Sequence, residues 1–129
     1  KGRELAVNPH AALCFHWGPL DRQVRIEGPV TQIADAESDT YWSARPVLSR
    51  LSASISPQSE VIASREWLES RVREAAKQRR DGIPRPASWG GYRVAHEVVE
   101  FWQAGTHRLH DRLRYRREAG AWRIDRLAP

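Results

Sequence analysis

The sequence of 129 residues contains one cysteine, Cys14, and no methionine. A single cysteine excludes an intramolecular disulfide and fits a reducing compartment, so we expect a cytoplasmic protein. Because Cys14 lies inside the apolar run 11–15, we expect its thiol to be buried and unreactive. The chain begins at Lys1 without a methionine and shows no signal peptide, so we expect the encoded protein to start further upstream.

Long apolar runs and clusters of metal ligands are also missing. No apolar run approaches the ~20 residues that a membrane-spanning helix needs, so no membrane partner is expected. No cysteine cluster and no pair of histidines at metal-binding spacing occurs, so no metal site is expected. There are no internal repeats, and 129 residues suffice for one domain with its own core.

Charge of one sign is in excess. Lysine and arginine outnumber the acidic residues 21 to 16, which gives a net charge of +5 and an isoelectric point near 10.1. Such an excess suits either nucleic acid or a small anionic ligand. Because acidic residues interrupt the basic ones and no nucleic-acid-binding motif occurs, we expect a small ligand and no nucleic acid.

The hydrophobic pattern predicts a protein made mainly of strands, with helices inserted between them. Strands are expected over 11–17, 23–27, 30–33, 91–95, 98–103, 111–117 and 122–127, with an interruption at 28–29 and a turn at 118–120. A helix capped by Ser64 and running to residue 79 carries an apolar stripe of Leu68, Val72, Ala75 and Ala76. Residues 81–86 are a linker by composition.

A shorter helix, which begins at Asp35 and ends before Pro46, carries candidate binding residues. Asp35 is a good N-cap, and Tyr41 and Arg45 fall one turn apart on one face. Pro46 ends this helix, because the residue before a proline is pushed out of helical geometry. Ser49 then caps a short second helix.

The segment 99–112 contains the clearest chemical signal. Arg108, His110 and Arg112 occupy alternate positions after an apolar strand that ends in Trp102. In an extended backbone, alternate residues point to one side, so two guanidinium groups and an imidazole would face one pocket beside an indole. That arrangement suits a planar, phosphorylated anion. The alternative is a solvated basic strand edge.

The same segment resembles the signature of the pyridoxamine 5'-phosphate oxidase family. The matching pattern is Glu100-Phe101-Trp102-Gln103, four variable residues, then Arg108-Leu109-His110-Asp111-Arg112. The resemblance extends to residues 1–5, 8–11, 22–30, 41–49, 57–59, 88–92 and 126–129. It implies an FMN-binding split β-barrel, with residues 1–129 as the C-terminal part of a single domain whose first strands are missing from this chain.

The resemblance also implies an activity. The family uses FMN to oxidise pyridoxine 5'-phosphate or pyridoxamine 5'-phosphate to pyridoxal 5'-phosphate, with dioxygen as electron acceptor and hydrogen peroxide as product. It further implies a homodimer with flavin at the subunit interface. Two alternatives stay open: a related flavin oxidase of the phenazine-biosynthesis type, acting on another flat anion, and a non-catalytic fragment that binds flavin or pyridoxal phosphate.

By resemblance, two sets of residues bind the substrate. Tyr41, Arg45 and Ser49 match the family's phosphate-binding positions, although Tyr41 alone could be a half-buried aromatic and Ser49 alone a simple helix cap. Arg108 and His110 match the residues that hold the substrate ring against the flavin, and they are the expected catalytic residues. A proton-acceptor role for His110 does not follow from the sequence, which cannot place it near the proton.

A third set matches the family's flavin-binding positions: Lys1, Gln23, Gln58, Ser59, Trp102 and Arg112, with Gln23 contributed by the neighbouring subunit. Trp102 has the alternative of a core aromatic. The remaining histidines are expected to be structural or exposed: His10, His16, His96 and His107. The remaining tryptophans are expected to serve in packing: Trp17, Trp42, Trp67, Trp89 and Trp122.

Overall fold

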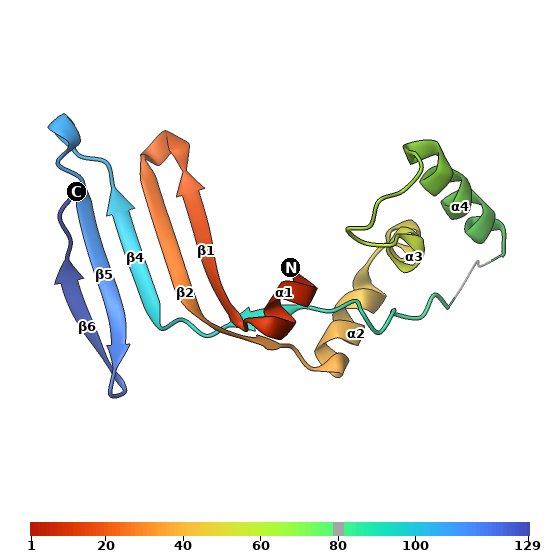
Figure 1. The fold of residues 1–129 in the computed structure, drawn as a ribbon, viewed down its shortest axis with the longest axis horizontal. Coiled ribbons are helices and arrows are strands. Elements are labelled where there is room, and N and C mark those ends of the chain that lie inside the picture. Colours follow the sequence, from red (N-terminus) through yellow and green to blue (C-terminus); the bar gives the residue numbers. More distant parts are fainter. Residues whose placement is uncertain (79–81) are drawn as a thin grey trace. The chain divides into compact units, whose positions relative to one another are not determined.

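The computed structural model of the chain describes residues 1–78 and 82–129. Its elements are α1 (Gly2–Val7), β1 (His10–Trp17), β2 (Arg22–Gln32), α2 (Asp35–Ala44), α3 (Val47–Ile55), α4 (Arg65–Gln78), β3 (Tyr92–Val94), β4 (Val98–Gln103), β5 (Asp111–Glu118) and β6 (Ala121–Arg126) (Figure 1). They form two compact units, a sheet unit (Lys1–Gln32 and Tyr92–Pro129) and a helical unit (Ile33–Gly91). Whether residues 1–129 belong to a single domain stays a prediction.

The sheet unit is antiparallel, with strand order β1-β2-β4-β5-β6, and β3 pairs with the end of β2. The predicted strands all occur, and their ends agree to within one residue. The interruption expected at Gly28–Pro29 is wrong, because β2 runs through both residues. What changes there is the pairing: β2 pairs with β1 and β4 up to this point and with β3 beyond it.

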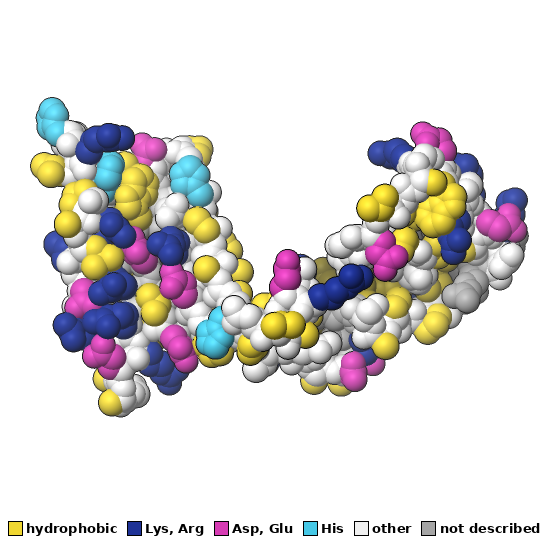
Figure 2. Space-filling view, in the orientation of Figure 1, with side chains coloured by type: hydrophobic (Ala, Val, Ile, Leu, Met, Phe, Trp, Pro, Cys, Tyr) yellow, Lys and Arg dark blue, Asp and Glu magenta, His cyan; other side chains and the backbone are white. Residues whose placement is uncertain are grey.

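Strand alternation gives the sheet two different faces. One face is apolar and includes exposed Leu13, Phe15, Trp17, Phe101, Trp122 and Ile124. Figure 2 shows basic and acidic side chains interleaved over the sheet unit. Cys14 lies beside Arg25 on the polar face and is exposed, so the expectation of a buried thiol is wrong. The apolar run predicted a strand correctly, but its alternation turns Cys14 away from Leu13 and Phe15.

The helical unit begins with α2, whose bounds correct two capping predictions. Ala34 is the N-cap of α2 and no side chain caps it, so Asp35 is its first helical residue. Pro46 ends α2 as predicted and is itself the N-cap of α3. Ser49 is therefore the third residue of α3 rather than its cap.

The core of the helical unit contains Trp42, Leu51 and Ile83. Partly buried side chains from three of its segments pack against it: Ala53, Ile55, Val72, Ala75, Ala76 and Trp89. The stripe predicted on α4 is thus a packing face, and the predicted cap is confirmed, since the Trp67 amide donates to Ser64 Oγ at 3.1 Å. The predicted helix end at residue 79 and the linker's first residue, 81, lie outside the described residues.

Ile83 corrects the expectation that residues 81–86 only connect other elements. Its side chain is buried, and its carbonyl accepts a hydrogen bond from Trp42 Nε1 at 2.9 Å. Composition identified an irregular segment but not that an apolar residue within it completes the core. No described helix is both long enough and apolar enough to cross a membrane.

The point where β2 changes partners generates a test. A Cβ at Gly28 would lie 1.8 Å from the carbonyl oxygen of Ala95, a backbone atom that cannot move aside. We expect Gly28→Ala to lower the free energy of unfolding by about 1–3 kcal/mol, as overpacking does. Gly18→Ala is the control, because its Cβ would meet only His16 Cε1 at 3.7 Å. If the two variants unfolded at the same urea concentration, the close contact between Gly28 and the Ala95 carbonyl would not require glycine.

Candidate functional site

Three of the predicted flavin-binding residues lie side by side in the sheet unit. The register pairs Gln23 of β2 with Trp102 of β4, and Trp102 with Arg112 of β5. Directly paired residues in antiparallel strands point to the same face. An amide, an indole and a guanidinium group therefore form one row across the polar face, which we call the sheet row.

The buried carboxylate of Glu100 anchors this row. Glu100 is only 8% exposed, and its Oε1 accepts from Arg112 Nε at 2.8 Å while Arg25 Nη1 lies 3.8 Å from Oε2. Arg112 Nη1 also donates to the carbonyl of Ala128 at 2.9 Å. The hydrogen bond from Glu100 raises the pKa of Arg112, so the guanidinium stays charged. Sequence reasoning gave Glu100 no role, although its position two residues before Trp102 puts it on the same face.

The prediction placed Arg108 and His110 in an extended segment with Arg112, but in the structure both residues precede β5. A 3-10 turn covers Thr106–Arg108, and β5 begins only at Asp111. His107 and Arg108 have φ values of 54° and 64°, in the left-handed region. The prediction that Arg108, His110 and Arg112 alternate along one extended segment is therefore wrong. Such backbone costs on the order of 1–3 kcal/mol per residue and is concentrated at functional sites.

The turn nevertheless brings His110 to the sheet row. Its ring centroid lies 5.0 Å from that of Trp102, and its Nδ1 accepts from the Gly105 amide at 3.2 Å. An accepting Nδ1 leaves the proton of neutral imidazole on Nε2, which is then a donor. Glycine is required at 105, because a Cβ there would lie 1.9 Å from the Leu109 carbonyl oxygen. Arg108 is exposed.

Two of the predicted phosphate-binding residues contact the same tryptophan in the helical unit. Arg45 lies beyond the end of α2 in extended geometry, so the prediction that it shares a helix face with Tyr41 is wrong. Both side chains instead contact Trp89: the Tyr41 ring stacks on it at 5.9 Å, and the Arg45 guanidinium lies 5.1 Å from its ring centroid. Arg45 also lies 5.8 Å from the ring of Trp42. Ser49 is half-buried in the first turn of α3.

The other predicted flavin-binding residues belong to other elements of the two units. Gln58 and Ser59 are exposed in the helical unit after α3, and Ser59 has a φ of 66°. Lys1 is exposed at the start of the sheet unit. Their roles stay predictions. Across residues 1–78 and 82–129, no three histidine, cysteine or acidic side chains group as metal ligands.

Comparison with known proteins matches both parts of the chain to one family. Residues 1–79 match a family model described as pyridoxamine 5'-phosphate oxidase, and residues 89–129 match one described as the pyridoxine 5'-phosphate oxidase C-terminal dimerisation region. Pyridoxine/pyridoxamine 5'-phosphate oxidase 1 of Ralstonia nicotianae is 54% identical over 130 residues, covering 100% of this chain and 61% of the relative. The oxidase of Thermosynechococcus vestitus is 54% identical with the same coverage. The chain spans about three-fifths of these relatives' length.

Solved structures confirm the expected fold class. The crystal structure of PhzG from Burkholderia lata, in complex with tetrahydrophenazine-1-carboxylic acid, matches with a TM-score of 0.91 and 34% identity, over 100% of this chain and 63% of that one. A pyridoxamine 5'-phosphate oxidase-related, FMN-binding protein from Nostoc punctiforme matches with a TM-score of 0.67 over 98% of this chain and 66% of that one. At 16% identity, this second likeness concerns the fold alone.

The anchoring role of Glu100 is open to a direct test. Glu100→Gln keeps the size of the side chain and removes the charge that Arg112 and Arg25 share. We expect the free energy of unfolding to fall by about 1–3 kcal/mol, because the bond from Arg112 loses its charged acceptor and two arginines lose a buried counter-charge. Glu97→Gln, at an exposed position before β4, is the matched control. Urea unfolding curves that shift equally for both variants would show that Glu100 is not an anchor.

Proposed function

Because the chain belongs to the pyridoxamine 5'-phosphate oxidase family, we propose that its protein oxidises pyridoxine 5'-phosphate or pyridoxamine 5'-phosphate to pyridoxal 5'-phosphate. FMN is the proposed cofactor and dioxygen the proposed electron acceptor. Residues 1–129 would form the C-terminal part of one FMN-binding split-barrel domain. The observation that carries the proposal is the sheet row, Gln23, Trp102 and Arg112, with the ring of His110 against it.

The chemistry of the sheet row fits a flavin. A flat heteroaromatic ring needs an apolar surface with a few polar groups at its edge, which Trp102 and the Gln23 amide supply. Arg112 adds a cation that Glu100 holds in place and keeps charged. Gln23, Trp102 and Arg112 would hold FMN, which would supply the hydride acceptor for the substrate carbon, with dioxygen as the final electron acceptor and hydrogen peroxide as product.

The helical unit offers the groups that a substrate phosphate needs. Arg45 rests on two indole rings, and no carboxylate pairs with it among the described residues. The Tyr41 side chain is 66% exposed, so its hydroxyl is available. Ser49 lies in the first turn of α3, where backbone amides favour an anion. These three residues are the proposed phosphate site.

Arg108 and His110 are proposed to hold the substrate ring. The exposed guanidinium of Arg108 can lie flat against a pyridine ring, as arginine does against other planar groups. His110 offers its Nε2 proton to a polar group of the substrate, because Nδ1 already accepts from Gly105. Correct placement of the reacting carbon lowers the barrier even when the protein supplies no covalent step.

The similarity to PhzG favours a second candidate, a related oxidase of another flat anion. The two candidates differ in what Arg45 does, because only a phosphorylated substrate requires a phosphate site. A third candidate is a non-catalytic flavin-binding protein. Absorbance at about 450 nm reports bound flavin, and peroxide release with each substrate separates the enzymes from a carrier.

Arg108→Ala and Arg112→Ala should fail in different ways. Loss of Arg108 should leave flavin bound and reduce turnover of pyridoxine 5'-phosphate at least about tenfold, because the ring is no longer oriented. Loss of Arg112 should weaken flavin binding about tenfold to a hundredfold, the effect of one charge-assisted hydrogen bond. Flavin titration and steady-state peroxide assays on the complete protein measure both effects.

Arg117→Ala is the control for these variants, because Arg117 is exposed on the opposite face of β5 from Arg112. It should match the parent protein in both assays. If Arg112→Ala bound flavin normally and Arg108→Ala turned over substrate normally, segment 99–112 would be an ordinary solvated strand edge and not a binding site. The proposed assignment of the sheet row would then be abandoned.

We also infer that the protein is a homodimer with flavin at the subunit interface, where all three side chains of the sheet row come from one subunit. Support comes from the match of residues 89–129 to a dimerisation region and from the exposed apolar side chains of β1, β4 and β6. Symmetric dimers are the commonest oligomers. Sedimentation of the flavin-loaded protein should give twice the subunit mass. A monodisperse monomer that retains flavin would rule the dimer out.

A further inference from the structure

Trp89 is a half-buried tryptophan whose position is held from two directions in the helical unit. Its indole packs edge-on against the buried Trp42 ring, with 4.8 Å between centroids and an angle of 67°. Its carbonyl accepts from Arg85 Nη1 at 2.6 Å, and its amide donates to the Pro86 carbonyl at 2.9 Å. Neither the ring nor the backbone of Trp89 is therefore free to move independently of the core.

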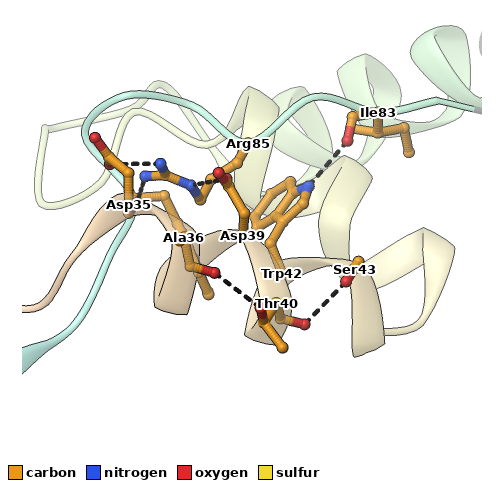
Figure 3. Close-up of polar contacts among 9 residues, drawn as sticks. Asp35, Ala36, Asp39, Thr40, Trp42, Ser43, Ile83 and Arg85 are labelled. Atoms are coloured by element: carbon orange, nitrogen blue, oxygen red, sulfur yellow. Dashed lines mark hydrogen bonds and ion pairs between the residues drawn. The ribbon is translucent and has the colours of Figure 1, made fainter.

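Arg85 ties this segment to α2. Its Nε donates to Asp39 Oδ1 and its Nη2 to Asp35 Oδ1, each at 2.6 Å (Figure 3). Its Nη1 donates to the Trp89 carbonyl. The side chain of Arg85 is only 10% exposed. Its hydrogen bond to Asp39, and to a smaller extent the one to Asp35, raises the pKa of Arg85, so the guanidinium group stays charged. One guanidinium thus sets where the backbone of Trp89 lies relative to the helix that carries Tyr41.

Both of the candidate phosphate ligands Tyr41 and Arg45 contact the indole of Trp89. The Tyr41 ring lies parallel to the indole, with an interplanar angle of 12°. The Arg45 guanidinium lies over the same indole at 5.1 Å, close enough for a cation–π contact. Arg45 gains this contact without a competing carboxylate among the described residues, so its donors stay available to an anion.

We infer that Trp89 is a positioning residue for the substrate phosphate: its indole holds Tyr41 and Arg45 in the conformation that binds the phosphate. The inference rests on the proposed function and extends it to a residue that touches neither substrate nor cofactor. A free arginine side chain loses much rotamer entropy on binding a ligand, and a side chain held in place beforehand loses less. The indole therefore contributes to affinity for phosphorylated substrates and not to the redox step.

The test compares Trp89→Leu, Trp89→Phe and Arg45→Ala with the parent in the complete, flavin-loaded protein. Leucine fills much of the space of the indole without a π face, whereas phenylalanine restores one. We expect Trp89→Leu to raise KM for pyridoxine 5'-phosphate about fivefold, the effect of one partly exposed cation–π contact. The value of kcat and the flavin affinity should change less than about twofold, and Trp89→Phe should recover most of the lost affinity.

A matched control comes from a second tryptophan–arginine pair of the helical unit. Arg71 lies 4.9 Å from the ring of Trp67 on α4, and neither residue is predicted to bind substrate or flavin. Trp67→Leu should leave KM and kcat unchanged. A double variant of Trp89→Leu and Arg45→Ala should show less than the product of the two single effects, because Trp89 acts partly through Arg45.

The outcomes separate this inference from the function on which it rests. If the parent releases no peroxide, or if Arg45→Ala leaves KM unchanged, the proposed function or its phosphate site fails, and the inference fails with it. If Arg45→Ala raises KM and Trp89→Leu does not, only the positioning role is overturned. It is also overturned if Trp89→Leu lowers kcat alone, if phenylalanine gives no rescue, or if the leucine variant does not fold.

Discussion

The register of β2, β4 and β5 is the constraint on which the proposed flavin site depends. It places Gln23, Trp102 and Arg112 in one row, although they come from distant parts of the sequence. A shift by one residue would turn Trp102 and Glu100 to the opposite, apolar face, so the register is strongly specified. Glu100 adds an electrostatic reason for the same alignment, because its carboxylate must meet Arg112.

In the described part of the helical unit, Arg45 is positioned by aromatic rings and not by an ion pair with a carboxylate, so its donors are available to an anion. Arg45 is held by indole rings, whereas Arg85, nearby in the same unit, is held by Asp35 and Asp39. A cation–π contact orients a guanidinium and leaves its donors unused, while an ion pair uses them. The two arginines therefore have different roles: Arg85 is structural, and Arg45 is available for a ligand.

Both units hold proposed site residues in unusual backbone. Arg108 and Ser59 have left-handed φ values, and each belongs to a motif that matches the family's binding positions. His110 is brought to Trp102 by a turn that requires glycine at 105. Loops of this kind carry binding residues more often than regular elements do, because a rigid scaffold can aim them. Their geometry follows from contacts that no local sequence pattern encodes.

The sequence by itself determined the strands, the C-terminal end of α2, and the cap and apolar stripe of α4, because periodicity, capping and proline act over a few neighbouring residues. Its motifs also identified the family. It also indicated every residue of the sheet row. Tertiary structure alone decided that Cys14 is exposed, that Ile83 completes a core, and that Arg108 lies in a turn rather than on a strand. It also decided that Glu100 anchors Arg112 and that Tyr41 and Arg45 both contact Trp89. These outcomes depend on contacts between groups that are distant in the sequence, which pair buried charges and pack aromatic rings. The spacing of residues along the chain does not predict such contacts.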